Sequence, residues 1–209
     1  MDFMEWILVI FAYLLGSIPS GVVVARLMGG ADPRSGGSGN IGATNVLRTL
    51  GKKAAAATLA GDFLKGVIPV SAALILLPAD SPFVYLTAGA AILGHDFSFL
   101  LAFKGGKGVA TTIGTLTVLS PLVALLLLAT WLTVVVVTRY SSAGALTAAA
   151  MSPVFALLVI GDGRLALFCI FAAALLIFLH RENVKRLMAG TEGRIGERKS
   201  SESKVQSSE

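Results

Sequence analysis

Charged residues are scarce in this sequence. Only 14% of its 209 residues are Asp, Glu, Lys or Arg, whereas 55% are hydrophobic. A typical soluble domain has about 25% charged and about 45–50% apolar residues. Mean hydropathy is correspondingly high, at +0.81. This balance excludes an ordinary soluble domain and predicts an integral membrane protein.

Cysteine and histidine are also nearly absent. The single cysteine, Cys169, lies inside an apolar run, which excludes a disulfide framework and predicts a buried side chain. The two histidines, His95 and His180, are far apart in the sequence and do not make a metal site by themselves. We therefore expect neither a metal nor another cofactor.

The N-terminus lacks the basic segment of a signal peptide. Asp2 and Glu5 precede the first apolar run, so no cleaved signal peptide is expected. The formal net charge of +5 comes from basic residues that lie between apolar runs rather than along one face. Such a distribution is typical of loops beside a membrane, and we expect no nucleic-acid partner.

Seven apolar segments are candidates for membrane helices, given that a spanning helix needs about 20 apolar residues. The run 109–138 is too long for one upright helix, and Pro121 divides it. The predicted segments are residues 5–27, 54–77, 83–103, 109–119, 121–138, 143–160 and 164–180.

Basic residues determine the predicted orientation, because loops that face the cytoplasm collect Lys and Arg. With the N-terminus outside, only Arg164 of the 17 lysines and arginines falls on the outer side, and only Lys65 falls within a span. The sequence therefore predicts an all-α integral membrane protein with seven transmembrane helices, one of them short, and a cytoplasmic C-terminus. We expect residues 1–199 to form a single transmembrane domain and the polar residues 200–209 to form a disordered tail.

Three polar islands face the cytoplasm in this topology. The first comprises residues 35–53, the second residues 104–108 and the third residues 180–199. Glycine-rich backbone that leads into a helix is a natural anion site, and irregular backbone near a membrane must line protein or a water-filled cavity. We therefore expect an anion-binding pocket at the cytoplasmic membrane surface.

The first island combines glycines with neutral hydrogen-bonding groups and an arginine whose planar fork suits phosphate. Residues 37–42 match G-x-G-x-x-G but follow a membrane helix rather than a strand, which excludes a dinucleotide site. The alternative is a flexible loop with ordinary basic anchoring. The candidate ligands are Ser38, Asn40, Thr44, Asn45 and Arg48.

The second island places two lysines, Lys104 and Lys107, around a glycine turn that opens the helix predicted from Val109. Both lysines, and the amides of Gly105 and Gly106, are candidate anion ligands. The segment lacks the spacing and the Ser or Thr of a Walker A loop, so a nucleotide is not expected. Ordinary anchoring by positive charge is the alternative.

The third island continues the last predicted span into water. His180 and Asn183 are separated by three positions and share one helix face, so both can touch one substrate. A cap at the helix end is the alternative for His180. Glu182 and Arg186 are expected to form a solvated ion pair.

Four ionisable residues fall inside predicted spans. Asp62 and Lys65 are three positions apart and are expected to neutralise each other. His95 and Asp96 either form a buried hydrogen-bonded pair that supports the fold or take part in catalysis. Ionisable residues at membrane depth are candidates for function, so both alternatives stay open.

The motifs SGNIGATNVLR, GHDFSFLLAFKGGKGVAT and HRENVKRLMAGTE occur in this order between the apolar segments. In order and spacing, over residues 5–197, they resemble the bacterial acyl-phosphate:glycerol-3-phosphate acyltransferase family, known as PlsY. One departure is Ile41, where many members carry proline. The resemblance implies transfer of a fatty acyl group from acyl phosphate to the 1-hydroxyl of sn-glycerol 3-phosphate. The products are lysophosphatidic acid and phosphate, and the step belongs to phospholipid synthesis at the cytoplasmic face of the inner membrane.

The resemblance also implies roles for the candidate residues. Ser38, Arg48 and Lys107 would hold the phosphate of glycerol 3-phosphate, with His180 and Asn183 on its hydroxyls. The implied ligands of the acyl-phosphate head and the oxyanion are Thr44, Asn45, Lys104 and the amides of Gly105 and Gly106. His180 would act either as a general base or as an orienting group, with the substrate phosphate then taking the proton.

The implied partners are glycerol 3-phosphate, a fatty acyl phosphate, membrane lipid and a soluble enzyme that supplies the acyl phosphate. A membrane transporter of phosphate-containing anions is the competing class. The polar groups gather at one membrane face, whereas transporter sites typically lie near the midplane between repeats. This distribution favours the enzyme.

Overall fold

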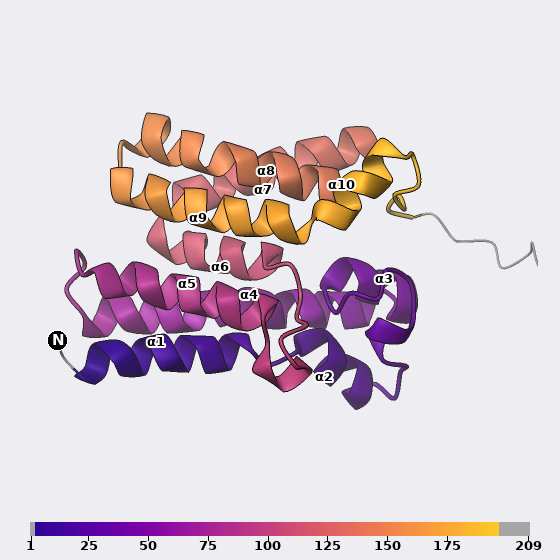
Figure 1. Ribbon diagram of the computed structural model, residues 1–209, viewed down its shortest axis with the longest axis horizontal. Coiled ribbons are helices and arrows are strands. Elements are labelled where there is room, and N and C mark those ends of the chain that lie inside the picture. The colour runs from indigo at the N-terminus through magenta and orange to yellow at the C-terminus, as the bar shows by residue number, and fades with distance from the viewer. Residues whose placement is uncertain (1–2, 197–209) are drawn as a thin grey trace, which may run out of the picture.

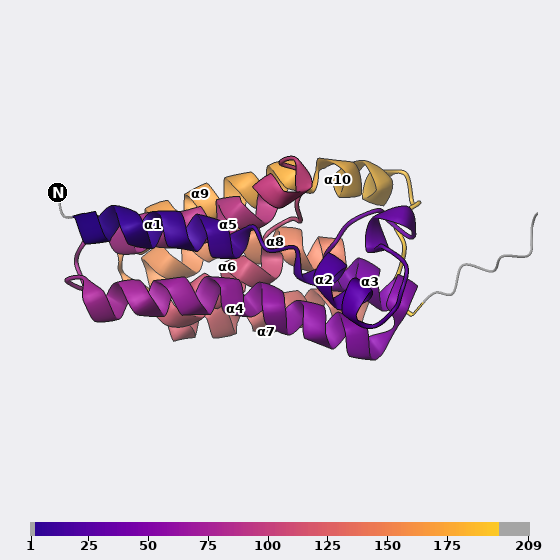
Figure 2. The ribbon, with the colours of Figure 1, turned by 90° about the horizontal axis from the view of Figure 1, so that it is seen from below.

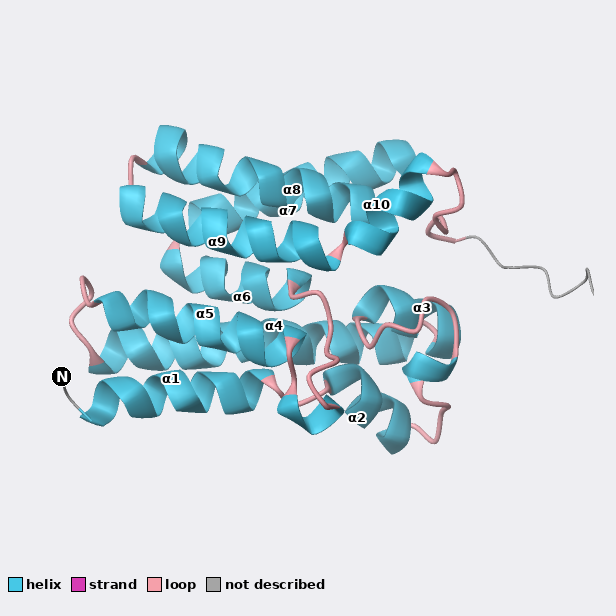
Figure 3. Cartoon of the chain, in the orientation of Figure 1, coloured by secondary structure: helices cyan, strands magenta, loops and turns pink. Residues whose placement is uncertain are grey.

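The protein is a bundle of helices. The computed structural model describes residues 3–196, within which the chain forms no β-strand (Figure 3); the predicted tail, residues 200–209, lies outside the described residues. The all-α prediction is confirmed. The elements are α1 (Phe3–Gly16), α2 (Ser20–Leu27), the 3-10 turn η1 (Pro33–Ser35), α3 (Ala43–Leu50), α4 (Lys52–Leu76), α5 (Pro82–Asp96), the 3-10 turn η2 (Phe99–Leu101), α6 (Val109–Leu119), α7 (Pro121–Thr138), α8 (Ser141–Phe155), the π-helical turn η3 (Ala156–Ile160), α9 (Gly163–Leu179) and α10 (Arg181–Met188).

The long helices α1 and α4 to α9 lie side by side along the longest dimension of the molecule (Figure 1). The short helices α2, α3 and α10 gather at the end opposite the N-terminus, and a second view confirms this arrangement (Figure 2). The most extensive pairings are α1 with α5, α4 with α6, and α8 with both α7 and α9. The short helices, and with them the first and third polar islands, therefore meet at one end of the bundle.

Prolines, glycines and caps set the ends of the helices. Pro82 and Pro121 each occupy the first turn of a helix, where a missing N–H costs nothing. Asp162 caps α9 by accepting hydrogen bonds from the backbone of Arg164 and Leu165, at 2.8 and 3.0 Å. Gly51, with a φ of 86°, separates α3 from α4, because few other residues adopt that conformation.

Glycine pairs bring two helix pairs into close contact. A Cβ on Gly66 of α4 would lie 2.3 Å from the carbonyl oxygen of Thr111, and a Cβ on Gly114 of α6 would lie 2.2 Å from that of Phe63. Gly16 and Gly94 produce the same approach between α1 and α5. Small residues at helix interfaces are typical of membrane bundles, where backbones pack closely without a hydrophobic driving force.

Within residues 3–196, four helical segments are long and apolar enough to cross a bilayer, and the count rises to six if each of two bent pairs is one span. Helix α6 matches the predicted short segment. Large apolar side chains on α7 point outward, for example Val136 and Val137, which are 71% and 78% exposed. Lipid covers such a surface at no cost. The number of crossings and the sides on which the termini lie stay predictions.

The first predicted span, residues 5–27, is not one continuous helix. It breaks between α1 and α2, whose axes differ by 47°. Pro19 causes the break, because proline lacks the N–H of a helix interior and disfavours helical backbone at Ile18. The Ser17 hydroxyl donates to the Tyr13 carbonyl oxygen at 2.8 Å, which satisfies an acceptor at the end of α1.

The first polar island is more ordered than a flexible loop. Residues Ala43–Leu50 form α3, with Val46 fully buried. Val46 packs with Ala54 and Ala55 of α4, and Val24 and Leu50 cover this small core. The island therefore has its own apolar anchor, which turns the polar face of α3 toward the rest of the site.

Candidate substrate site

A cavity of about 600 Å³ joins the polar end of the bundle to its apolar interior. This volume is typical of a small-molecule site. Most of its polar lining comes from the three islands and the start of α8, namely Ser38, Asn40, Thr44, Asn45, Arg48, Lys107, Ser141, Ser142, His180, Asn183 and Glu192. Helices α4, α5, α6 and α8 add Asp62, His95, Thr112 and Ser152. Its apolar lining comes from α4 and α6 to α9 and includes Leu59, Phe63, Ile113, Leu127, Leu128, Trp131, Ala145, Ala149, Ala172 and Leu176.

Asn45 on α3 organises the glycine-rich loop before it. The side chain is 2% exposed, and its oxygen accepts the backbone N–H of Ser38 at 2.8 Å. Its amide nitrogen donates to the carbonyl oxygens of Pro33 and Asn40, both at 2.7 Å. The side-chain oxygen of Asn40 in turn accepts the N–H of Gly42 at 2.8 Å. The side-chain amides of Asn40 and Asn45, both predicted as substrate ligands, thus hold the loop that presents Ser38 to the cavity.

Arg48 and Thr44 connect the first island to its neighbours. The Arg48 guanidinium donates from Nη2 to the Gly193 carbonyl oxygen of the third island, at 2.8 Å. The Thr44 hydroxyl lies 3.3 Å from that of Ser141, at the start of α8. Both residues line the cavity as predicted, and a carbonyl engages only one of the five N–H donors of the arginine.

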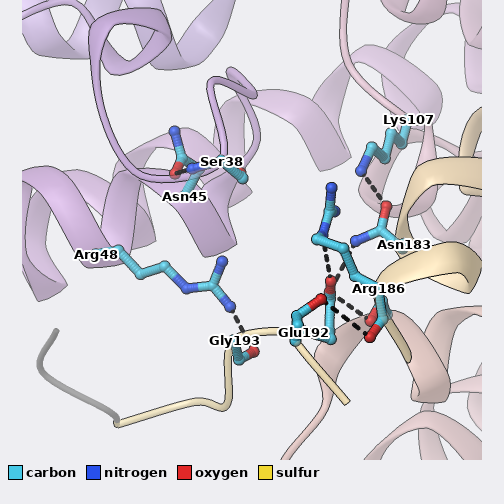
Figure 4. Close-up of polar contacts among 10 residues, drawn as sticks. Ser38, Asn45, Arg48, Lys107, Asn183, Arg186, Glu192 and Gly193 are labelled. Carbon is cyan, nitrogen blue, oxygen red and sulfur yellow. Dashed lines mark hydrogen bonds and ion pairs between the residues drawn. The ribbon is translucent and has the colours of Figure 1, made fainter. Parts of the chain in front are cut away.

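A chain of hydrogen bonds ends on one buried carboxylate (Figure 4). The Lys107 ammonium donates to the side-chain oxygen of Asn183, whose amide nitrogen donates to Glu192 Oε1 at 2.8 Å. Ser142 donates to the same oxygen at 2.7 Å, and Arg186 Nε donates to Glu192 Oε2 at 2.7 Å. Glu192 thereby connects the second island to α8 and α10.

Positive charge exceeds negative charge at this end of the cavity. Burial, together with the nearby charge of Arg186, lowers the pKa of Lys107 to about 8. Burial would raise the pKa of Glu192, but hydrogen bonds from Ser142, Arg186 and Asn183 hold that pKa below its ordinary value. One ionised carboxylate therefore faces several cations, and the net field favours an anionic ligand.

His180 lies at the 58° bend between α9 and α10 and is 4% exposed. Its Nδ1 is 2.9 Å from the carbonyl oxygen of Leu176. A carbonyl only accepts hydrogen bonds, so Nδ1 carries the proton and Nε2 is the acceptor of the neutral ring. His180 and Asn183 both line the cavity, but the bend at His180 means that they do not lie on the one continuous helix that their spacing predicted.

The amides of Gly105 and Gly106, predicted to bind substrate, are engaged within the chain. Their N–H groups donate to the carbonyl oxygens of Asp96 and His95, each at 3.0 Å, and close the turn after α5. Lys104 is exposed and, among the described residues, lies outside the cavity lining. Of the second island, Lys107 alone of the predicted ligands reaches the cavity.

One predicted ion pair, Glu182–Arg186, and one predicted hydrogen-bonded pair, His95–Asp96, also need correction. Glu182 pairs with Lys185 at 3.0 Å on the surface, whereas Arg186 pairs with the carboxylate of Glu192. His95 lies against Asp62, which also pairs with Lys65 at 2.8 Å as predicted. Within residues 3–196, the Asp96 carboxylate has no hydrogen-bond partner, so a His95–Asp96 pair does not form.

The motifs gave no individual role to Glu192, Ser141 or Ser142. Glu192 offered one signal, since it is an acidic residue in a basic island and follows a helix end within the sequence AGTE. Its partner Ser142 is 50 positions away, and only the fold brings the two together. Across the described chain, no group of three or more His, Cys, Asp and Glu side chains could hold a metal ion.

The fold and the cavity define a class of protein. It is an integral membrane protein whose site joins a cationic pocket to an apolar chamber, and such a site suits an amphipathic, anionic ligand. Comparison with known proteins identifies the family. The family model described as glycerol-3-phosphate acyltransferase matches residues 6–190. The chain belongs to this family.

Relatives and solved structures agree with this assignment. A glycerol-3-phosphate acyltransferase of Bordetella pertussis is 50% identical over 200 residues, which cover 92% of each chain. One from Methylococcus capsulatus is 46% identical, over 92% of this chain and 96% of its own. The crystal structure of PlsY (YgiH), an integral membrane glycerol 3-phosphate acyltransferase, in its glycerol 3-phosphate form is 44% identical. It has a TM-score of 0.88 and covers 92% of this chain and 96% of that chain, so the predicted membrane fold is confirmed.

Proposed function

We propose that the protein transfers a fatty acyl group from acyl phosphate to the 1-hydroxyl of sn-glycerol 3-phosphate and releases lysophosphatidic acid and phosphate. The cavity carries the proposal, because its cationic end suits two phosphorylated groups and its apolar walls suit an acyl chain. The names of the relatives support the acceptor, and a second PlsY structure, in a lysophosphatidic acid form with a TM-score of 0.86, supports the product.

The polar residues take roles according to their chemistry. Ser38, Arg48 and Lys107 hold the phosphate of glycerol 3-phosphate by charge-assisted hydrogen bonds. His180 and Asn183 contact the glycerol hydroxyls and orient the 1-hydroxyl. The acyl chain extends between α4 and α6 to α9, so that its carbonyl carbon meets the hydroxyl where the polar and apolar linings join.

The chemical step needs no covalent intermediate, because an acyl phosphate is a mixed anhydride with a good leaving group. The hydroxyl oxygen bonds to the acyl carbon, and the bond from that carbon to the phosphate oxygen breaks. The hydroxyl proton leaves through His180 Nε2 or a substrate phosphate and ends on the released phosphate. Positioning and charge stabilisation therefore supply most of the acceleration.

We further propose that the site opens to the cytoplasm from the inner membrane. The segments that contain many of the basic residues, among them α2, α3 and α10, lie at the end of the bundle that carries the cavity (Figure 1), as positively charged segments do on the cytoplasmic side. A soluble enzyme would then deliver acyl phosphate from that side.

Purified protein tests the proposal in detergent and in liposomes. Acyl phosphate and glycerol 3-phosphate should give lysophosphatidic acid with no second protein present, as measured by mass spectrometry. A transporter of phosphate-containing anions would instead exchange labelled glycerol 3-phosphate across the liposome membrane and form no lysophosphatidic acid. That result would contradict the proposal.

Arg48→Ala should raise the KM for glycerol 3-phosphate by about 10- to 100-fold. The variant loses a hydrogen bond to a charged group, worth about 1.5–3 kcal/mol. Steady-state kinetics at saturating acyl phosphate provide the measurement. Arg34→Ala is the matched control, since Arg34 is exposed and pairs with Asp32 at 2.6 Å. A normal KM in the Arg48 variant would remove Arg48 from the phosphate site.

The pH dependence of kcat/KM should report the charge of Lys107. The ammonium form binds phosphate, and the pKa of Lys107 is lowered to about 8 by burial and by Arg186. Activity at low glycerol 3-phosphate should therefore be full well below pH 8 and fall about tenfold per pH unit well above it. Lys107→Arg keeps its charge across this range and should lack the fall. An unchanged profile in that variant would assign the fall to another group.

A further inference from the structure

Four ionisable side chains lie in or next to the wall of the cavity, buried in the bundle, and the proposed chemistry leaves them without a role. Asp62 and Lys65 come from α4, His95 and Asp96 from the last turn of α5, and each is at most 4% exposed. Lys65 Nζ donates to Asp62 Oδ1 at 2.8 Å, and His95 Nδ1 lies 3.5 Å from the same oxygen. Ionisable groups at membrane depth are costly. The pair of Asp62 and Lys65 already balances its own charge, so His95 requires a separate explanation.

His95 contacts the glycine turn that carries Lys107. Its carbonyl oxygen accepts the N–H of Gly106 at 3.0 Å, and its ring packs directly against the Cα of that glycine. A Cβ on Gly106 would lie 2.0 Å from His95 Nε2 and 2.9 Å from two ring carbons. His95 therefore holds the turn through its backbone carbonyl, and its ring limits the space on one side of Gly106.

Asp62 lies against His95 and bonds to the helix that follows the same turn. Its contact with His95 Nδ1, at 3.5 Å, is electrostatic, because within residues 3–196 that nitrogen has no hydrogen-bond partner. Its carboxylate faces the His95 ring, while its carbonyl oxygen accepts a hydrogen bond from the Thr111 hydroxyl at 2.9 Å. Thr111 belongs to the first turn of α6 and is fully buried. One residue of α4 thus anchors the segment that precedes Lys107 and the helix that follows it.

Lys107 lies between these two anchors. It follows Gly106 directly, lines the same cavity as Asp62 and His95, and reaches across to Asn183 on α10. We propose that Asp62 and His95 are positioning residues that set where Lys107 presents its ammonium to the substrate. The identity of that substrate rests on the proposed function. The placement of Lys107 rests only on the contacts of Asp62 and His95 with the turn and with α6.

His95→Asn tests the contact between the ring and the turn. The asparagine amide can replace imidazole Nδ1 beside Asp62 but lacks the ring edge that touches Gly106. The KM for glycerol 3-phosphate should rise at least about tenfold with kcat within about threefold, because a small displacement of a binding group is costly. An amine-reactive reagent should also label Lys107 faster, relative to the exposed Lys104, as measured by mass spectrometry.

A double variant separates positioning from general destabilisation. Gly106→Ala clashes with the His95 ring in the wild type but finds space in His95→Asn. The effects of the two changes on KM and on Lys107 labelling should therefore be non-additive, with the double variant no worse than Gly106→Ala alone. A purely structural role would lower the thermal unfolding temperature of each variant and leave Lys107 labelling unchanged.

Thr87→Val is the matched control on α5. Thr87 is fully buried, and in the described part of the chain its hydroxyl has no hydrogen-bond partner, so the change should affect neither KM nor labelling. If His95→Asn behaves like this control in both measurements, the inference is overturned. If the wild type forms no lysophosphatidic acid, the proposed function fails, and Lys107 labelling still decides the positioning role.

Discussion

Replacing Lys107 with methionine should lower kcat/KM for glycerol 3-phosphate by about 100- to 1,000-fold. That range is typical when one preorganised group that stabilises charge in the transition state is removed. Methionine nearly matches the length and shape of the lysine stem, so the change removes the ammonium and little packing. The loss should be measured by lysophosphatidic acid formation at limiting glycerol 3-phosphate. The same variant should lose the fall in activity above pH 8.

The Lys107 ammonium also donates to Asn183, so part of the loss is indirect. An unpaired buried amide oxygen costs about 1–3 kcal/mol, and Asn183 would then hold the glycerol hydroxyls less firmly. Lys185→Met controls for removal of a lysine near the site, since Lys185 is exposed on α10 and pairs with Glu182. Equal activity of the Lys107 and Lys185 variants would place the phosphate elsewhere in the cavity.

Hydropathy and proline positions predicted most of the helices. The predicted segments 109–119 and 121–138 coincide with α6 and α7, because Pro121 both ends one apolar run and starts the next helix. The break at Pro19 was missed, since average apolarity stays high across it and the bend depends on local backbone geometry. Helix α3 was missed for the opposite reason: it is only eight residues long, and its polar residues Thr44, Asn45, Arg48 and Thr49 alternate with its few apolar ones, so no long apolar run marks it.

Residue chemistry predicted which side chains line the cavity better than it predicted what they do there. Ser38, Arg48, Lys107, His180 and Asn183 come together from three islands, as their shared polarity on one membrane face indicated. Asn45 was predicted as a ligand on the same grounds, yet its amide is fully engaged by the loop. The direction in which this amide points follows from the path of the preceding loop, which brings Pro33, Ser38 and Asn40 around Asn45, and residue type alone does not specify that path.

Replacing Glu192 with alanine should both destabilise the protein and remove most of its activity. The carboxylate accepts hydrogen bonds from Ser142, Asn183 and Arg186, and its side chain is 6% exposed. Removal of one partner from a fully buried ion pair typically costs about 3–5 kcal/mol, and the loss here should be smaller because Arg186 is 38% exposed and can regain water. The thermal unfolding temperature in detergent should fall clearly. Glu182→Ala, which removes a carboxylate exposed on α10, should leave it unchanged.

Glu192→Gln distinguishes the charge of this group from its hydrogen bonds. Glutamine keeps one oxygen for Ser142 and Asn183 but turns an amide donor toward Arg186, so its unfolding temperature should lie between those of wild type and Glu192→Ala. The unfolding temperature should fall only in part, because Asn183 and Lys107 remain connected. The value of kcat/KM should fall strongly, because the ionised carboxylate that orients Arg186 and balances the cations is lost. If Glu192→Ala unfolds at the wild-type temperature and retains full kcat/KM, the carboxylate is neither a structural centre of the site nor a support for Lys107.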